Sequence, residues 1–151
     1  MKKLLSDIFD VRSIKLNLDG KTKEMVFIEL VDCIADLNLG CDRAEMLSSI
    51  KKREEEINTG VGNGVAILRC VCKGAGKMAG AVGISQQGLD YGSVDNKPVH
   101  VIFFLVCWEQ DPSDNHLQVC NYLFNLAKSE AVSMLKNAKD AQEIYAFLSH
   151  A

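Results

Sequence analysis

The sequence predicts an α/β protein with a single mixed β-sheet that is flanked by helices on both faces. Segments with the apolar spacing of helices alternate with short strand-like segments along the 151 residues. One strand-like segment, residues 99–108, is apolar at almost every position, as expected for a central strand that helices cover on both sides. No linker, repeat or low-complexity segment interrupts the pattern, so we expect a single domain over residues 1–151.

The first third of the chain predicts one strand and two helices. Residues 13–18 alternate between apolar and polar side chains, which is typical of a half-buried strand. Apolar residues at helical spacing predict a helix over about residues 22–37. These apolar residues are Phe27, Leu30, Val31 and Ile34. Asp42 and Glu45 form a D-x-x-E capping pattern at the start of a second helix, which ends among residues 51–56.

Two further strands are expected before the central one. They cover residues 65–70 and 78–84, and Gly80 and Gly83 allow close packing in the second of them. The polar residues 85–97 predict a turn-rich connection to the central strand.

The last third of the chain predicts three helices after an acidic loop at residues 109–115. An apolar stripe of Leu117, Cys120, Phe124 and Ala127 marks the first helix. The other two helices are residues 129–135 and a terminal helix that a D-x-x-E pattern at Asp140 and Glu143 caps.

The composition narrows the classes of partner. A formal net charge of -3 gives no support for binding to nucleic acid. No apolar run approaches the ~20 residues of a spanning helix. Asp7 and Asp10 interrupt the start of the chain before the apolar region of a signal peptide could form. We therefore expect a cytoplasmic protein without membrane insertion.

The cysteines predict free thiols rather than disulfides. They are Cys33, Cys41, Cys70, Cys72, Cys107 and Cys120. A chain of this size without an export signal favours thiols that are mostly buried. Cys70 and Cys72 form the only close pair, and a single C-x-C without a neighbouring histidine is a weak metal signal. We expect neither a metal nor another cofactor.

A glycine-rich turn between a charged helix end and a strand is the most informative part of the sequence. Residues 53–70 read R-E-E-E-I-N-T-G-V-G-N-G-V-A-I-L-R-C. Backbone in such turns can approach a ligand closely. The stretch resembles the R-E-x-x-x-S-T-G-x-G-x-G-x-A-I-P-H signature of type-2 EIIA domains of the phosphoenolpyruvate:sugar phosphotransferase system (PTS), which include fructose, mannitol and nitrogen-regulatory proteins.

The resemblance extends over nearly the whole chain. Residues 22–24 look like the start of the family's first helix. Residues 95–100 resemble its G-x-P-V stretch, with Asn96 where the family has glycine. Residues 114–118, which begin with Asp114, resemble its D-x-H-L-x helix start. The resemblance therefore implies the type-2 EIIA fold.

The resemblance implies a position for the phosphoryl acceptor, and this chain carries a different residue there. In the family, the histidine of A-I-P-H accepts a phosphoryl group, but here Leu68 and Arg69 stand in place of the proline and the histidine. A guanidinium stays protonated and its lone pairs are delocalised, so it cannot accept the group, although it can bind phosphate or carboxylate bidentately. We therefore expect a nitrogen-regulatory (PtsN-like) protein that has lost histidine phosphoryl transfer, is not catalytic, and acts through protein–protein or anion binding.

The resemblance also marks supporting residues. His116 matches the family histidine that helps to position the phosphoryl group, and its alternative is a capping or surface role. Arg53 matches the family arginine near the active site, and its alternative is an exposed arginine at a helix end. Our candidate anion- or phosphate-binding residues are Arg53, Thr59, Asn63 and Arg69. For Thr59 and Asn63, the alternative is that they only shape the loop.

An alternative function is an active phosphocarrier that uses His116 or Cys70 as a non-standard acceptor. Adjacent residues on a strand point to opposite faces, so Cys70 is expected to point away from a pocket that Arg69 faces. The partners that the resemblance implies are an HPr-like or NPr-like carrier, an EIIB-like protein, or a regulated transporter or sensor kinase. The sequence also leaves open whether the protein forms a homodimer.

Overall fold

The computed structural model describes residues 2–74, 76–109, 111 and 115–150. The strands are β1 (Phe9–Lys15), β2 (Gly60–Gly62), β3 (Val65–Cys72), β4 (Ala79–Leu89) and β5 (Val99–Trp108). The helices are α1 (Lys2–Ile8), α2 (Lys23–Ala35), α3 (Arg43–Glu56), α4 (Asn115–Ala127), α5 (Ala131–Lys136) and α6 (Ala141–Ser149).

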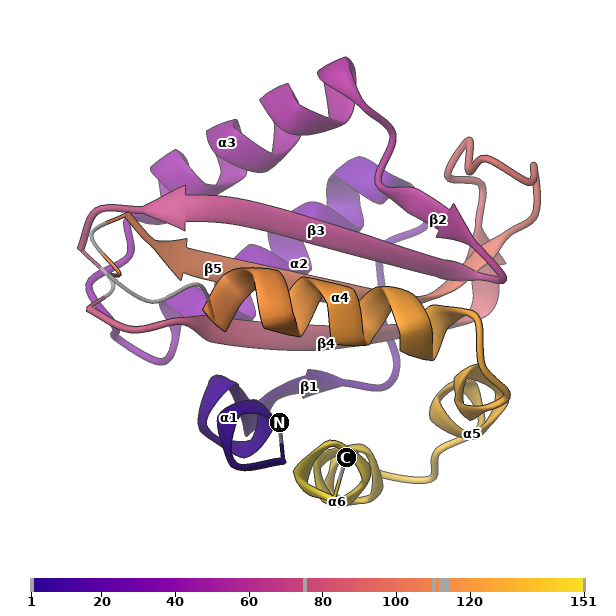
Figure 1. The fold of residues 1–151 in the computed structure, drawn as a ribbon. Coiled ribbons are helices and arrows are strands. Elements are labelled where there is room, and N and C mark those ends of the chain that lie inside the picture. The colour runs from indigo at the N-terminus through magenta and orange to yellow at the C-terminus, as the bar shows by residue number, and fades with distance from the viewer. Residues whose placement is uncertain (1, 75, 110, 112–114, 151) are drawn as a thin grey trace.

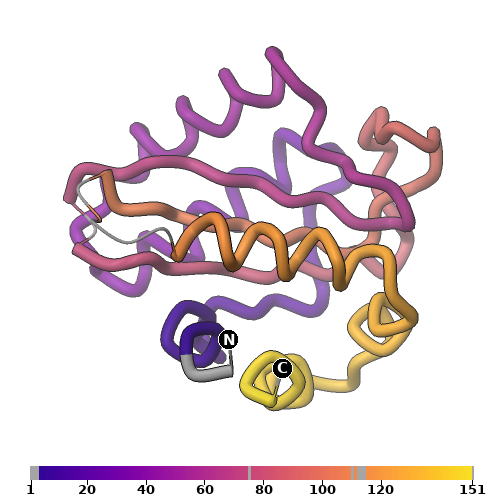
Figure 2. Tube along the Cα trace, in the orientation of Figure 1, coloured from indigo at the N-terminus to yellow at the C-terminus, as the bar shows by residue number. Residues whose placement is uncertain are grey.

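The strands form one mixed sheet in the order β1-β4-β5-β3-β2 (Figure 1). β1 pairs with β4 and β3 pairs with β5 in parallel, whereas β4 pairs with β5 and β2 pairs with β3 in antiparallel orientation. β5 lies in the middle, so the prediction of a central strand is confirmed. The fold class is confirmed as well, because helices cover both faces (Figure 2).

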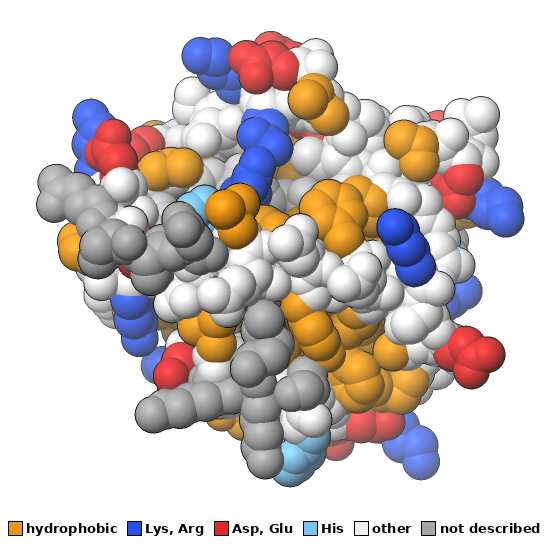
Figure 3. Space-filling model, viewed as in Figure 1, with side chains coloured by type: hydrophobic (Ala, Val, Ile, Leu, Met, Phe, Trp, Pro, Cys, Tyr) orange, Lys and Arg blue, Asp and Glu red, His pale blue; other side chains and the backbone are white. Residues whose placement is uncertain are grey.

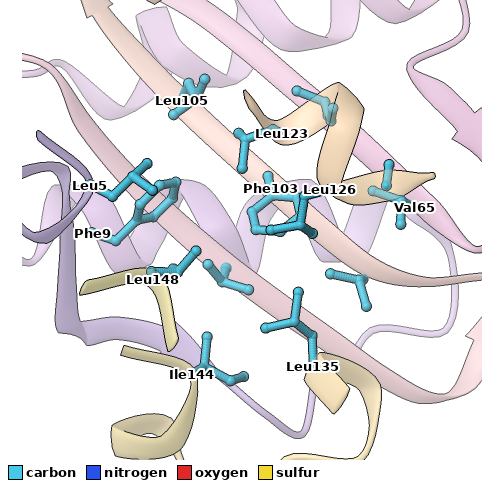
Figure 4. Packing of buried hydrophobic residues seen from close by; sticks show 14 of the residues in the cluster. Leu5, Phe9, Val65, Phe103, Leu105, Leu123, Leu126, Leu135, Ile144 and Leu148 are labelled. Carbon is cyan, nitrogen blue, oxygen red and sulfur yellow. The ribbon is translucent and has the colours of Figure 1, made fainter. Parts of the chain in front are cut away.

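The side chains of β5 divide between two hydrophobic cores. Phe103 and Leu105 face a core that α1, α4, α5 and α6 cover, and Phe104 faces a second core beneath α2 and α3. Figure 4 shows side chains of the first core converging on the sheet. The labelled residues are Leu5, Phe9, Val65, Phe103, Leu105, Leu123, Leu126, Leu135, Ile144 and Leu148. The alternation along β5 explains why nearly every residue of this strand is apolar.

The local patterns at helix starts and glycines are confirmed. The Asp42 carboxylate accepts a hydrogen bond from the backbone N–H of Glu45 at 3.0 Å, and the same contact caps α6 from Asp140. A Cβ atom on Gly80 would lie 2.5 Å from the ring of Phe9, so glycine is required for this close approach.

The edges of the sheet differ from the predictions. β1 spans Phe9–Lys15 rather than 13–18, because it is an edge strand whose early residues Val11 and Arg12 are exposed and hide the alternation. It is preceded by α1, which the sequence patterns did not reveal. β4 runs to Leu89 instead of residue 84, since its polar continuation follows a shift of register against β5 and faces solvent in part.

The glycine-rich turn forms a hairpin, which is a second difference. Residues 60–62 of the predicted turn are strand β2, which pairs with the start of β3. Asn63 and Gly64 join the two strands with positive φ angles of 55° and 77°, the combination that a tight type I′ hairpin turn requires.

Helix α4 buries Cys120 and Ala127 of the expected stripe, but Leu117 and Phe124 of that stripe do not face the core. Its buried residues are Val119, Cys120, Leu123, Leu126 and Ala127. Leu117 and Phe124 are 48% and 42% exposed. Both stripes have helical spacing, so the sequence alone could not decide which one faces the sheet.

The remaining expectations concern the cysteines, metal sites, membrane-spanning helices and the acidic loop. The six cysteines are free, and four of them are buried. Within the described part of the chain, no cluster of His, Cys, Asp or Glu could hold a metal ion, and no helix is long and apolar enough to cross a membrane. Asp114 of the D-x-H-L-like motif, and much of the predicted acidic loop, lie outside the described residues.

Candidate functional site

Four of the candidate residues from the sequence line one groove of about 600 Å³, which we call the sheet-end groove. They are Arg53, Arg69, His116 and Cys70, although the Cys70 side chain is buried in the opposite core. Arg69 comes from β3, Arg53 from the last turn of α3, and His116 from the first turn of α4. The groove also carries carboxylates, including Glu56 and Glu109, so its charge is mixed. The structure thus brings together residues that are up to 63 positions apart, from Arg53 to His116.

The strand pattern explains the direction of Arg69. Alternation along β3 turns this side chain toward α4, where the guanidinium Nη1 lies 4.0 Å from Cys120 Sγ. Cys120 is four residues from His116 and therefore lies on the same face of the helix. Among the described residues, neither Arg69 nor Arg53 forms an ion pair with a carboxylate.

Cys70 points to the opposite face of the sheet, as predicted. Its side chain is buried in the core beneath α2 and α3. Burial raises the pKa of the Cys70 thiol far above its usual range, and the neighbouring Cys107 and Cys72 thiols raise it further. The thiolate that nucleophilic attack needs is therefore strongly disfavoured at neutral pH.

Thr59 belongs to a buried polar network behind the glycine-rich turn. Its hydroxyl donates to Glu54 Oε2 at 2.7 Å and lies 2.7 Å from the hydroxyl of Tyr91. Glu54 also accepts hydrogen bonds from the backbone N–H of Thr59 at 3.1 Å and from Lys23 Nζ at 2.8 Å. Because its proton is held by Glu54, the Thr59 hydroxyl has no donor left for an anion.

Asn63 lies at the far end of the hairpin and outside the grooves that Arg69 lines. Its side-chain Nδ2 donates to the carbonyl of Ala127 at 2.8 Å, at the end of α4. Its backbone N–H donates to Asp95 Oδ2 at 3.0 Å. These contacts fasten the hairpin to a helix and to a loop, which is the loop-shaping role that the sequence left open.

A second groove of about 480 Å³ adjoins the first, and we call it the hairpin groove. Arg53 and Arg69 line both grooves, and Thr59 lines the second. Its other lining residues include four that the sequence reasoning did not single out as site residues. They are Ile57, Val94, Phe124 and Lys128. The position of Phe124 on an apolar stripe of α4 was a usable signal, but that of Val94 depends on how a distant loop folds.

The family described as "Phosphoenolpyruvate-dependent sugar phosphotransferase system, EIIA 2" matches residues 7–151. The chain belongs to the EIIA type-2 family. This confirms the family that the glycine-rich motif predicted, and it places the sheet-end groove on an EIIA fold.

Known proteins similar to this EIIA chain come from both sugar and nitrogen-regulatory branches. The PTS fructose-specific EIIABC component of Bacillus subtilis is 30% identical over 128 residues, which are 85% of this chain and 20% of that protein. The chain thus spans about a fifth of this relative's length. The structure of nitrogen regulatory protein IIA-Ntr from Neisseria meningitidis is 25% identical, with a TM-score of 0.87 over 96% of this chain and 99% of that one.

A third comparison concerns the fold alone. The complex of enzyme IIA-mannitol with phosphorylated enzyme IIB-mannitol from Escherichia coli contains a chain with 17% sequence identity and a TM-score of 0.78. The match covers 95% of this chain and 100% of that one. The type-2 EIIA fold, in its mannitol and nitrogen-regulatory forms, is therefore confirmed.

Proposed function

We propose that the chain is a cytoplasmic EIIA-type, PtsN-like regulatory protein that has lost histidine phosphoryl transfer and acts through protein–protein or anion binding. Its partner would be an HPr-like or NPr-like carrier, an EIIB-like protein, or a regulated transporter or sensor kinase. The EIIA surface is retained in this proposal, while the chemical step is lost.

The position of Arg69 carries the proposal. Its side chain faces the sheet-end groove at the place that the motif assigns to the acceptor histidine. A phosphoryl acceptor needs a nucleophilic lone pair at neutral pH, which imidazole has and guanidinium lacks. A guanidinium is instead a bidentate donor to carboxylate or phosphate, which suits recognition of an anionic group.

A second candidate is an active phosphocarrier that uses another acceptor. His116 supports it, because this imidazole lines the same groove as Arg53 and Arg69. Cys70 is the weaker choice, since its buried thiol lies on the opposite side of the sheet with a raised pKa.

Phosphorylation in a reconstituted system tests both candidates. The purified chain is incubated with radiolabelled phosphoenolpyruvate, enzyme I and HPr, with a working EIIA domain as the positive control. The proposal expects no stable label on the wild-type chain. Label that His116→Ala or Cys70→Ser abolishes would establish the second candidate and overturn the first.

Restoring the motif gives the matched gain-of-function arm. Arg69→His and the double change Leu68→Pro/Arg69→His are tested beside the wild type. If only the acceptor has been lost, the double variant should gain label while Arg12→Gln, on the opposite edge of the sheet, should not. A wild-type chain that labels as fast as the double variant would contradict the proposal.

A further inference from the structure

The hairpin groove differs from the sheet-end groove in the charge of its lining residues. Among the described residues that line it, the charged ones are Arg53, Arg69 and Lys128, and none is acidic. Three cations around one concave surface attract anions and repel other cations. The groove therefore has a definite electrostatic preference that the mixed-charge sheet-end groove lacks.

The two arginines have no anionic partner among the residues that the structure describes. Both are half-buried, and in the described part of the chain neither is ion-paired. Two acids adjoin lining residues in the chain, Glu54 beside Arg53 and Asp95 beside Val94, and both already accept hydrogen bonds. Glu54 accepts from Lys23 and Thr59, and Asp95 accepts from two backbone N–H groups at 3.0 and 3.1 Å. A bound anion would relieve the repulsion between two like charges that share one wall.

Most of the other side chains that line the groove are apolar, and several of them are exposed to solvent. Ile57, Val94 and Phe124 line it and are 66%, 74% and 42% exposed. Figure 3 shows hydrophobic side chains gathered on this face, with Lys and Arg side chains beside them. Exposed apolar patches next to charged groups commonly mark ligand sites. A volume of about 480 Å³ is the size of a small-molecule site.

From these observations we propose that the hairpin groove binds a small phosphomonoester with an apolar body. The phosphate lies against the guanidinium groups of Arg53 and Arg69, and the apolar body lies on Phe124 and Ile57. A phosphomonoester carries about -1.5 to -2 charge at neutral pH, so it matches two arginines better than a monoanion does. The inference rests on the proposed function, because it gives the anion-binding role of Arg69 a ligand class.

Titration with phenyl phosphate tests the site. Binding is followed by isothermal calorimetry and by amide chemical shifts, with inorganic phosphate as the ligand that lacks the apolar body. We expect saturable binding of phenyl phosphate at least tenfold tighter than that of inorganic phosphate. Arg53→Gln and Arg69→Gln should each weaken both ligands at least tenfold, whereas Phe124→Ala should weaken only phenyl phosphate.

Two controls keep the variants interpretable. Arg12→Gln removes an exposed arginine from β1 at the other edge of the sheet and should leave both affinities unchanged. Arg69→Lys keeps the charge but loses the bidentate geometry, so it should bind both ligands more weakly than wild type. Circular dichroism of each variant verifies its fold, and Arg53→Gln tests the site independently if Arg69→Gln does not fold.

Several outcomes would overturn the inference. One is the absence of saturable binding at phenyl phosphate concentrations up to about 10 mM. Others are equal affinity for both ligands, or affinities that neither arginine change alters. These results are distinct from a failure of the proposed function, which would appear as phosphate transferred from HPr to the wild-type chain whether or not phenyl phosphate binds.

Discussion

Replacing Glu54 by alanine should detach the glycine-rich turn from the body of the protein and destabilise the fold by about 3 kcal/mol. The side chain of Glu54 is 6% exposed and that of its ion-pair partner Lys23 is 22% exposed. Three donors lose the Glu54 carboxylate as acceptor: Lys23 Nζ, and the backbone N–H and hydroxyl of Thr59. Lys23 can regain water, so most of the cost comes from the buried groups of Thr59.

Urea unfolding measures this cost. With a slope of about 2 kcal/mol per molar urea, the midpoint should fall by about 1.5 M. Glu55→Ala is the matched control, because this neighbour is exposed and should change stability by no more than about 0.5 kcal/mol. A Lys23→Met/Glu54→Ala double variant should lose at least about 1 kcal/mol less than the sum of the single changes. Equal midpoints for Glu54→Ala and Glu55→Ala would refute the proposed role of the network.

Three further predictions concern the turn, the sheet and pH. Asn63→Ala should lower the unfolding free energy by about 2 kcal/mol, and Asn63→Gly should lower it by less. The reason is that glycine accepts the positive φ of 55° at this position, whereas alanine does not. Urea unfolding measures both changes, and the reverse order of stability would contradict this reasoning. Gly80→Ala should cost about 2 kcal/mol in the same assay, since the new methyl group would lie 2.5 Å from the buried ring of Phe9, and an unchanged midpoint would exclude the clash. Burial raises the pKa of the Cys70 thiol in the folded state above its usual value of 9.0. Above pH 9 the unfolded state releases this proton more readily than the folded state, so about 1 kcal/mol of the unfolding free energy should be lost between pH 9 and 10. Urea midpoints at these two pH values should show a smaller loss in Cys70→Ala.

The sequence predicted those parts of the fold that depend on local chemistry. The apolar central strand, the caps at Asp42 and Asp140, and the close approach at Gly80 all follow from residues that are near one another in the chain or that have one clear packing role. The edges were harder to predict. An edge strand such as β1 is half solvated, and its alternation is weak where Val11 is exposed.

Part of the site was also predictable, because it depends on the local geometry of one strand and on one sequence motif. Strand alternation predicted the opposite directions of Arg69 and Cys70, and a family motif placed Arg53 and His116 with Arg69. The hairpin groove was not predictable, because it depends on which stripe of α4 faces the sheet and on where the loop with Val94 folds. Both depend on contacts between distant parts of the chain.

The short length of β2 has a consequence for the solution behaviour of the protein. β2 pairs only with Val65 and Ala66 of β3, so the described structure gives Leu68–Cys72 no strand partner on that side. Unpaired edge backbone is a template for association between molecules, and a charged side chain on such an edge discourages it. Arg69 holds that position beside Val71, which is 53% exposed. An apolar residue at position 69 is therefore expected to promote aggregation through strand pairing, whereas glutamine, lysine or histidine should keep the edge polar.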